Sequence, residues 1–304
     1  MKQFVCFGEM LWDMLPSGKI PGGAPMNVAI HLKHFGHQVS VISRIGSDDL
    51  GKELIDFVKS KELNCQLIQQ GNTHLTGVVK VNMDDKSNVT YKIVKPVAWD
   101  YIQSEPLALD TVAQADCLVF GSLSARSPQS FETLKELLQV AKFKVLDVNL
   151  RPPYYDTTTL SYLMTQADVV KLNHHELAEI CSWFFVENTL EEQISRLATH
   201  FQLKTICVTL GADGAVLYHQ GLYYRSEGFP VEVCDTIGSG DSFLASFLSS
   251  FLQNDNYEYA LQKACAVGAL VATHHGATPF ISEESIGKCL AKKAQTDKIN
   301  VTMS

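Results

Sequence analysis

The sequence has no long apolar run and no excess of basic residues. No apolar stretch approaches the roughly 18 residues that a membrane-spanning helix needs, so we expect no membrane partner. The 25 Lys and Arg residues are outnumbered by 33 Asp and Glu residues, which gives a net charge of −8. A surface with this balance repels phosphate backbones, so we also expect no nucleic-acid partner. A small anion can still bind, because one pocket can be locally positive on an acidic protein.

The sequence also lacks closely spaced cysteine pairs. Its eight cysteines include no C-x-x-C pattern, which argues against a zinc ribbon or a redox dithiol. Most lie inside apolar runs, as Cys117 does, where a reduced cysteine behaves as a small hydrophobic residue. The apolar stretch near the N-terminus is too short for a signal peptide. We therefore expect a cytoplasmic protein without disulfides.

What the sequence does contain is enough apolar material for a sizeable core. Of the 304 residues, 46% are hydrophobic and 19% are charged, which excludes gross disorder. Short continuous apolar runs, typical of parallel strands buried on both faces, alternate with stretches of helical period. Strands are expected at Phe4–Phe7, Val39–Ser43, Cys117–Phe120, Lys144–Val148, Val169–Leu172 and Thr205–Thr209. This order predicts an α/β fold with a doubly wound, mostly parallel sheet flanked by helices, in a single domain over residues 1–304.

One part of the chain departs from this pattern. Residues 76–82 and 88–94 alternate apolar and polar side chains around a polar segment, 83–88, which indicates an antiparallel hairpin. A further exposed strand is expected at Leu11–Leu15. Together these segments, at about 11–20 and 74–97, predict a small β appendage inserted in the domain. The alternative is an ordinary hairpin at the edge of the main sheet.

Polar residues and glycines follow most of the predicted strands. In a doubly wound sheet ligands collect at the carboxyl ends of the strands, so these residues are candidates for a binding crevice. A simple turn would explain any one of them, but their recurrence at one edge favours a site. They are Gly8, Glu9 and Asp13, then Gly121 and Ser122, then Asn149 and Arg151, then Asn173 and Glu176, and finally Gly211 and Gly214.

The strongest local signal is the segment Gly238-Ser239-Gly240-Asp241, which precedes an amphipathic helix. A glycine-rich turn at a helix start presents backbone N–H groups and the positive end of the helix dipole, a combination that suits phosphate. Asp241 is a sensible base beside such a site, since it could accept a hydroxyl proton while the N–H groups hold the phosphoryl group. The alternative is that Asp241 only stabilises the helix dipole.

Several other patterns do not support a function. Gly46–Lys52 matches the start of a P-loop, but Glu53 stands where the metal-binding hydroxyl should be. No G-x-S-x-G supports a serine hydrolase, and no G-x-G-x-x-G after the first strand supports a nicotinamide enzyme. The adjacent histidine pairs at 174–175 and 274–275 diverge by about 100° on a helix, so they are poor metal sites.

These motifs together make the chain resemble the ribokinase (PfkB-type) family of sugar kinases over nearly its whole length. The matching segments, in family order, are Gly22-Gly-Ala-Pro-Met-Asn27, Asn173-His-His-Glu176, Thr209-Leu-Gly-Ala-Asp-Gly214 and Asp235-Thr-Ile-Gly-Ser-Gly-Asp241. Within the family the chain is most similar to bacterial fructokinases, as the segments Lys95–Asp100 and Asp147–Arg151 show. The resemblance implies ATP-dependent phosphorylation of a ketose hydroxyl, with fructose 6-phosphate as the expected product. It also makes the β appendage a lid over the sugar.

The resemblance implies a role for each matching residue. Asp241 would be the catalytic base, with Gly238, Ser239 and Gly240 as the anion hole. Asp13 and Asn27 would bind sugar hydroxyls, Gly23 would allow close backbone approach, and Arg151 would be a cation on the substrate or phosphate side. Thr209, Gly211 and Gly214 would lie at the nucleotide. The competing interpretations are a helix cap for Asn27 and a surface ion pair for Arg151.

The resemblance also implies metal ions and an oligomer. Asn173 and Glu176 match residues that organise Mg²⁺ through water and the nucleotide phosphates. A monovalent cation such as K⁺ would bind near Asp235, Ile237 and Gly276, although Phe280 stands where some members have a serine and speaks against K⁺ activation. Ser239 replaces the usual alanine and should have little effect. The resemblance is also compatible with a homodimer that forms through the lid.

Other functions stay open at this stage. The same class of kinase could act on 2-keto-3-deoxygluconate, ribose or a nucleoside, since Arg151 could equally meet a sugar-acid carboxylate. A sugar-sensing homologue without catalysis is a rival from another class. The joint presence of Asp241, the loop glycines and Glu176 argues against it, because a pure binder needs no such set.

Overall fold

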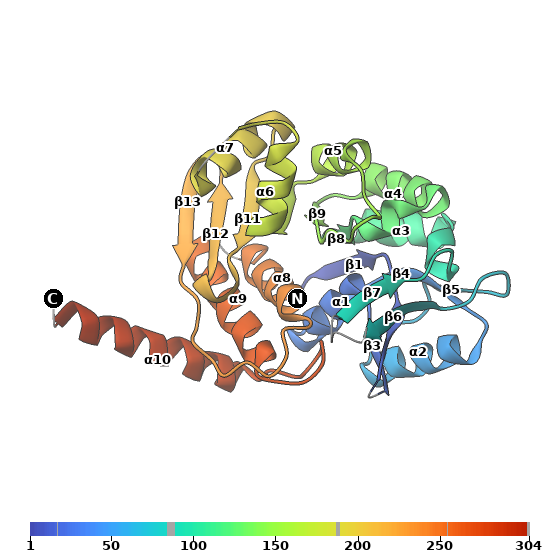
Figure 1. The fold of residues 1–304 in the computed structure, drawn as a ribbon, viewed down its shortest axis with the longest axis horizontal. Helices are drawn as coiled ribbons and strands as arrows, with labels where there is room; N and C mark the ends of the chain where they lie inside the picture. Colours follow the sequence, from blue (N-terminus) through green and yellow to red (C-terminus); the bar gives the residue numbers. More distant parts are fainter. Residues whose placement is uncertain (17, 84–88, 187–188, 254, 303–304) are drawn as a thin grey trace. The chain divides into compact units, whose positions relative to one another are not determined.

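The computed structural model describes residues 1–16, 18–83, 89–186, 189–253 and 255–302. The chain divides into two compact units, Met1–Val170 and Lys171–Ser304, which we call the first and second unit. In Figure 1 the first runs from blue to yellow-green and the second from there to red. The expectation of a single domain stays a prediction.

The main sheet of the first unit has five strands in the order β9-β8-β1-β4-β5, and all neighbouring pairs are parallel. They are β1 (Gln3–Phe7), β4 (Gln38–Gly46), β5 (Ile68–Gly71), β8 (Cys117–Gly121) and β9 (Lys144–Asp147). Phe4 in the central strand pairs with Val39 on one side and Cys117 on the other. Four consecutive residues of β1 are buried, as a parallel strand covered on both faces requires.

Helices connect these strands. The α-helices are α1 (Ala24–His34), α2 (Asp49–Ser60), α3 (Pro106–Gln114), α4 (Pro128–Val140) and α5 (Thr157–Gln166), and the short 3₁₀ helices are η1 (Ala98–Tyr101) and η2 (Leu123–Arg126). The helix α1 packs on β1, β4 and β8, and α4 packs on α3 and on both 3₁₀ helices. The predicted alternation of parallel strands and helices is confirmed.

The glycines and the aspartate of the P-loop-like segment Gly46–Lys52 have a structural role at the start of α2. Asp48 caps α2 by accepting a hydrogen bond from the Gly51 amide at 2.8 Å, and its carboxylate also accepts from the amide and hydroxyl of Thr76. A Cβ on Gly51 would overlap the Gly46 carbonyl oxygen. The two glycines and the aspartate therefore build a tight strand-to-helix turn, and its carboxylate would repel a phosphate.

The predicted β appendage is present as a second sheet of the first unit, which we call the small sheet. Its strand order is β3-β2-β6-β7, with β2 parallel to β6 and the two outer pairs antiparallel. The strands are β2 (Leu11–Leu15), β3 (Gly18–Gly22), β6 (Gly77–Met83) and β7 (Val89–Ile93). Residues 84–88 of the predicted hairpin turn lie outside the described residues.

The second unit has four strands in the order β10-β11-β12-β13, and the last three are antiparallel neighbours. The strands are β10 (Val169–Asn173), β11 (Thr205–Thr209), β12 (Ala215–His219) and β13 (Leu222–Ser226). The helices are α6 (His174–Ser182), α7 (Leu190–Phe201), η3 (Gly211–Asp213), α8 (Ser239–Phe251), α9 (Tyr257–Ala272) and α10 (Glu283–Thr302). The helices α8 and α9 pack closely, because Gly268 of α9 lets the backbone of Ser239 approach.

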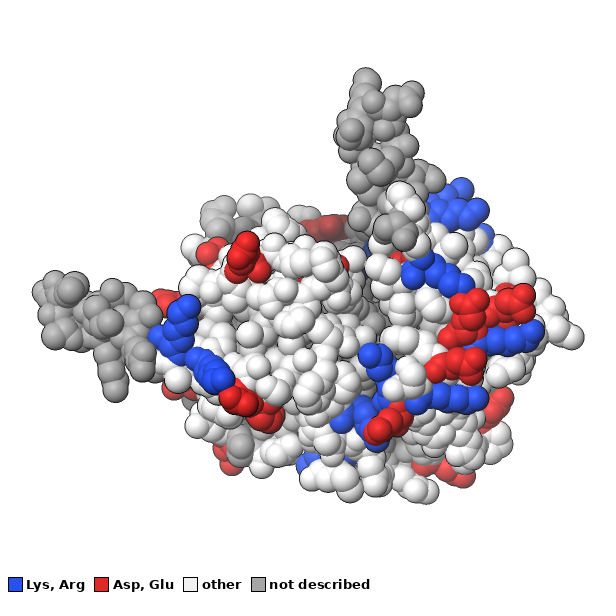
Figure 2. All heavy atoms as spheres, turned by 90° about the horizontal axis from the view of Figure 1, so that it is seen from below, with Lys and Arg blue, Asp and Glu red and all other residues white. Residues whose placement is uncertain are grey.

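Two observations concern the expectation that the protein has no membrane or nucleic-acid partner. None of the helices in the described part of the chain has the length and apolar content required to span a bilayer. On the face drawn in Figure 2, the described Lys and Arg side chains are interspersed with Asp and Glu side chains. That face therefore presents no broad basic tract for a nucleic-acid backbone.

Candidate active site

The carboxylate of Asp13 lies in the small sheet beside a glycine that makes room for it. A Cβ on Gly22, the last residue of β3, would overlap Asp13 Oδ2. Burial raises the pKa of Asp13 above the ordinary carboxyl value, and the charge of Arg151 lowers it in part. Asp13 and Arg151, predicted as sugar-side residues, are therefore electrostatic neighbours.

Gly23 and Asn27 lie together at the start of α1. Gly23 is the N-cap residue, with φ at 119°, and a Cβ there would overlap the Glu9 carbonyl oxygen. Only glycine fits this close backbone contact. Asn27 is buried in the first turn, and its backbone N–H donates to the Gly23 carbonyl at 3.0 Å. Since Gly23 is the N-cap, the helix-cap interpretation of Asn27 is wrong.

Arg151 follows β9, at the carboxyl end of the main sheet of the first unit. Its side chain is exposed, and Nη1 donates to the carbonyl oxygen of Leu150 at 2.9 Å. The charge of the guanidinium lowers the pKa of Asp13 in part, so Arg151 acts electrostatically on the small sheet. An exposed planar cation at a strand end can bind a carboxylate, a phosphate or sugar hydroxyls.

Asn173 and Glu176 form a reciprocal capping box at the start of α6. Asn173 Oδ1 accepts from the backbone N–H of Glu176 at 3.0 Å, and Glu176 Oε2 accepts from the backbone N–H of Asn173 at 2.9 Å. Glu176 is 8% exposed. The N-x-x-E spacing is therefore required by the helix start itself, and the box fixes a buried carboxylate at the carboxyl end of β10.

The loop Thr209–Gly214 follows β11 and is closed by its own backbone. The Leu210 amide donates to the Gly214 carbonyl at 2.8 Å, and Gly211 has φ at 63°. A Cβ on Gly214 would overlap the Ser226 carbonyl oxygen, so both glycines are needed for the turn.

A cavity of about 480 Å³ lies beside this loop. Its lining includes three acidic residues, Asp213, Glu227 and Glu258, and the cation Arg225 is already ion-paired with Glu191. Such a lining repels phosphates, so the charge distribution favours phosphate binding elsewhere in this unit.

The segment before α8 has the geometry predicted for an anion hole. Gly238 is the N-cap in the left-handed conformation, with φ at 77°, and Asp241 lies in the first turn. A Cβ on Gly238 would lie 2.6 Å from Ala277 Cα. The first bond inside the helix runs from the Ser242 amide to the Gly238 carbonyl at 2.8 Å, so the Gly240 amide precedes the helical ladder. Such a start binds anions.

Asp235 joins the segment before α8 to the segment around Gly276. Its Oδ1 accepts from the Ile237 amide at 3.0 Å, and its Oδ2 accepts from the Gly276 amide at 3.2 Å. The two predicted cation-binding segments are thus brought together. Because both carboxylate oxygens accept backbone N–H groups, a monovalent cation there would rely mainly on backbone carbonyls.

Lys171 is a candidate that sequence reasoning missed. It is the third residue of β10, only 7% exposed, and its Nζ lies 3.2 Å from the position that a Cβ would take on Gly240. An ammonium group therefore lies against the backbone of the anion hole. The available signal was one lysine in the apolar run Val169–Leu172, since lysine is rarely buried without a charged partner.

The described part of the chain has no cluster of metal-ligating side chains. Across the described ranges, no group of three or more His, Cys, Asp or Glu side chains is arranged to hold a metal ion.

The predicted site residues fall into two sets, one in each unit. Asp13, Gly23, Asn27 and Arg151 belong to the first unit, and the strand ends and the α8 start with Asp241 belong to the second.

Two relatives align with nearly the whole length of this chain. It is 28% identical to "Probable fructokinase-6, chloroplastic" of Arabidopsis thaliana, over 95% of this chain and 82% of that protein. It is 27% identical to "Probable fructokinase-3" of the same plant, over 99% and 94%.

Solved structures show the same fold. Fructokinase from Vibrio cholerae O395, crystallised with fructose, ADP and calcium, superposes with a TM-score of 0.82 at 24% identity, over 95% of this chain and 99% of that one. Fructokinase from Xylella fastidiosa with bound ATP gives a TM-score of 0.83 at 23% identity, over 96% and 99%. The model of the pfkB family carbohydrate kinases matches residues 17–284. The sequence motifs, the fold and this match agree, and the chain belongs to the pfkB family of carbohydrate kinases.

Proposed function

We propose that this carbohydrate kinase transfers the γ-phosphoryl group of ATP to O6 of D-fructose. The observation that carries the proposal is the start of α8, where Gly238 and Gly240 open the helix, Asp241 lies in its first turn and Lys171 adds a cation. The curated relatives named as fructokinases and the fructose-bound Vibrio cholerae structure support fructose as the acceptor.

In the proposed reaction Asp241 is the base. Its carboxylate accepts the proton of the sugar hydroxyl, the hydroxyl oxygen forms a bond to the γ-phosphorus, and the bond from that phosphorus to the ADP oxygen breaks. The transition state is mostly a matter of position and charge. The N–H groups at the α8 start and the ammonium of Lys171 stabilise the charge on the transferring group.

The residues of the first unit bind and orient the sugar. Asp13 and Asn27 accept and donate hydrogen bonds to its hydroxyls, and Gly23 lets the backbone approach it closely. Arg151 supplies the cation that distinguishes substrates at this end. Holding the hydroxyl in line with the phosphorus lowers the entropic part of the barrier.

A divalent metal fits beside Glu176 as part of the ATP complex. The capping box aims a buried carboxylate at the strand end, and a carboxylate oxygen suits Mg²⁺ held through water. Bound there with the nucleotide, Mg²⁺ would neutralise phosphate charge. The Asp235 segment and Gly276 would hold K⁺. Phe280 makes this site less favourable for K⁺, because some family members have a serine at that position. Thr209, Gly211 and Gly214 remain proposed nucleotide contacts.

Replacing Lys171 with Met is expected to lower kcat/KM for ATP by about 10- to 100-fold, the range for a hydrogen bond to a charged group. Met keeps most of the side-chain volume and removes only the charge. Steady-state kinetics with varied ATP measures the effect, and Lys204→Met, an exposed lysine before β11, is the matched control. Unchanged ATP kinetics in Lys171→Met would remove Lys171 from the phosphate site.

Replacing Arg151 with Met is expected to move the acid limb of sugar binding to higher pH. Ionised Asp13 accepts sugar hydroxyls, so KM for the sugar rises as the pH falls through the Asp13 pKa. Burial already raises that pKa and Arg151 opposes the rise, so removing Arg151 raises the pKa further. The pH dependence of sugar KM measures this, with Arg225→Met as a control expected to show no shift. An acid limb that stays in place contradicts the pairing.

The substrate is tested by ADP release from Mg-ATP with fructose, 2-keto-3-deoxygluconate, ribose and adenosine. The proposal expects the highest kcat/KM with fructose. A preference for 2-keto-3-deoxygluconate would keep the kinase mechanism and make Arg151 a carboxylate-binding residue. No ADP release with any of the four would favour a sugar-sensing role.

The cytoplasmic location and a homodimer through the small sheet stay predictions. A mass of twice the 33.7 kDa chain mass, measured by light scattering, would support the dimer.

A further inference from the structure

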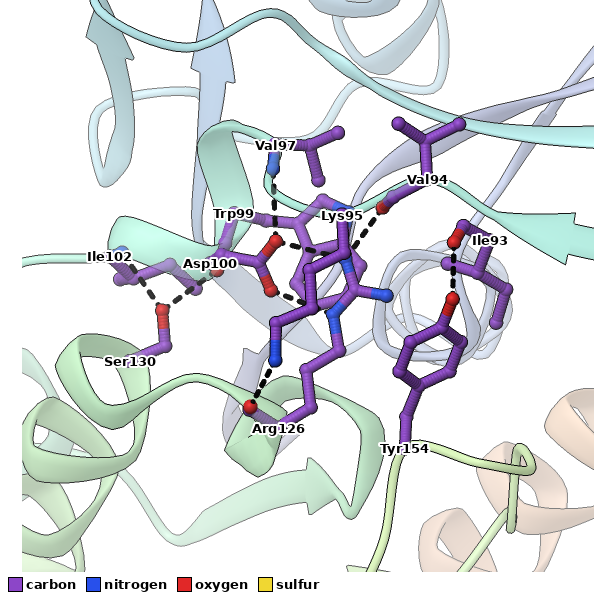
Figure 3. A network of polar contacts seen from close by, with 10 residues as sticks. All are labelled: Ile93, Val94, Lys95, Val97, Trp99, Asp100, Ile102, Arg126, Ser130 and Tyr154. Carbon is purple, nitrogen blue, oxygen red and sulfur yellow. Dashed lines mark hydrogen bonds and ion pairs between the residues drawn. The ribbon is translucent and has the colours of Figure 1, made fainter.

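Two side chains hold the backbone where β7 leaves the small sheet (Figure 3). The Tyr154 hydroxyl donates to the carbonyl oxygen of Ile93 at 2.6 Å. Arg126 Nη2 donates to the next carbonyl, that of Val94, at 2.8 Å. Tyr154 belongs to the loop between β9 and α5, and Arg126 ends η2. Two consecutive carbonyls at the end of β7 are thus bound by side chains from the connections that follow β8 and β9.

Arg126 is a fixed structural support. Its side chain is 1% exposed, and Nε and Nη2 bind both carboxylate oxygens of Asp100 at 2.7 and 2.9 Å. Its guanidinium stacks on the Trp99 ring at 3.8 Å, and Asp100 also accepts from the Val97 amide. Removing one partner of such a buried pair leaves a charge uncompensated, so substitutions here would report on folding rather than on catalysis.

Tyr154 differs because it contacts both the end of β7 and the loop between β9 and α5 that carries Arg151. Its ring is half-buried with the Arg126 guanidinium 4.7 Å from the centroid, and its hydroxyl binds Ile93. Its own amide donates to the carbonyl of Arg151 at 2.8 Å. One residue therefore joins the end of β7 to the backbone of the candidate sugar-side cation.

Strand register connects Ile93 at the end of β7 to Asp13 in β2. Val79 of β6 pairs with Asp13 of β2 on one side and with Ile93 of β7 on the other. Asp13 and Ile93 therefore lie in one cross-strand row. The Tyr154 hydroxyl binds the Ile93 end of that row, and the charge of Arg151 lowers the pKa of Asp13 at its other end.

We propose that Tyr154 is a positioning residue for the sugar, which sets the place of Arg151 relative to Asp13 through its hydrogen bond to Ile93. The inference rests on the proposed function in one respect, that Asp13 and Arg151 contact the sugar. Nothing in it requires Tyr154 to touch the substrate. All of these residues belong to the first unit.

The test removes one oxygen atom. Tyr154→Phe keeps the ring over Arg126 and deletes the hydrogen bond to Ile93. KM for the sugar is expected to rise about two- to tenfold, the range for one neutral hydrogen bond, while kcat and KM for ATP stay within about twofold. The acid limb of sugar KM should also move to higher pH, because a looser Arg151 no longer lowers the pKa of Asp13 as strongly.

The matched control is Tyr162→Phe, on helix α5. Tyr162 is also half-buried and packs its ring on Phe131, but its hydroxyl makes no hydrogen bond within the described residues. This variant is expected to keep the wild-type sugar KM and its pH dependence. A purely structural role for Tyr154 would instead lower thermal stability and change sugar and ATP kinetics together, without moving the acid limb, and would overturn the proposal.

Hydrogen exchange of the substrate-free protein tests the same bond without turnover. The amides of Val94 and Tyr154, bound to Val78 and Arg151, should exchange about tenfold faster in Tyr154→Phe, with the second unit unchanged. Unchanged exchange, or an unchanged sugar KM, overturns the proposal. A wild-type chain inactive on every sugar of the panel would contradict the proposed function instead, and the exchange comparison would still decide whether Tyr154 holds the loop.

Discussion

Replacing Asp241 with Asn is expected to lower kcat by about 10²- to 10⁴-fold, the usual contribution of a general base. Asn preserves the size of the side chain in the first turn of α8 and cannot accept the hydroxyl proton. The anion hole and the sugar-side residues stay in place, so binding of fructose and of ADP should be close to wild type. Steady-state ADP release measures the first effect, and calorimetry measures the second.

The control for this variant is Asp255→Asn. Asp255 is an exposed acid just before α9, outside the candidate site. Its loss removes the same charge from the same unit and should leave kcat unchanged. If Asp241→Asn kept turnover within tenfold of wild type, Asp241 would be a dipole-stabilising residue and the base would have to be sought elsewhere.

Replacing Gly238 with Ala is expected to abolish most activity, by more than about 10²-fold, because a displacement of about 1 Å at the reacting groups has that effect. The residue is left-handed, and its new Cβ would lie 2.6 Å from Ala277 Cα. The turn must therefore move, and the N–H groups of the anion hole move with it. Affinity for ADP should fall together with kcat.

The variant Gly221→Ala distinguishes the backbone strain of the left-handed conformation from the steric overlap that a Cβ meets at Gly238. Gly221 also has a positive φ, 87°, but its position leaves open space for a Cβ. Alanine there should cost about 1–2 kcal/mol of stability from the left-handed conformation alone, with kcat unchanged. Thermal unfolding and turnover of both variants give the comparison. Equal activity in Gly238→Ala and Gly221→Ala would contradict the importance of the α8 turn.

The parallel strands were predictable because burial on both faces leaves a continuous apolar run. That signal identified β1, β8 and β10 within a residue or two. The antiparallel strands β12 and β13 were missed. They meet at a two-residue turn, Gln220-Gly221, with His219 paired to Leu222, and this turn lacks the Asn-Gly signature of most tight hairpins.

The site was predictable where local backbone geometry dictates the residue. Gly238 and the capping box of Asn173 and Glu176 are visible in sequence because a helix start needs them. Lys171 was not, because its meaning depends on Gly240, which is distant in the chain. The role of Tyr154 depends on strand register, since Val79 alone places Asp13 and Ile93 in one row. Long-range pairing of this kind leaves no local pattern.

The identity of the phosphorylated product decides whether this kinase transfers phosphate to O6 of fructose. The wild-type protein would be incubated with Mg-ATP and fructose, and the product examined by ³¹P NMR with proton coupling. We expect ADP and a single phosphomonoester whose phosphorus couples to the protons on C6 of the sugar. Phosphate on C1, or ADP without any sugar phosphate, would contradict it.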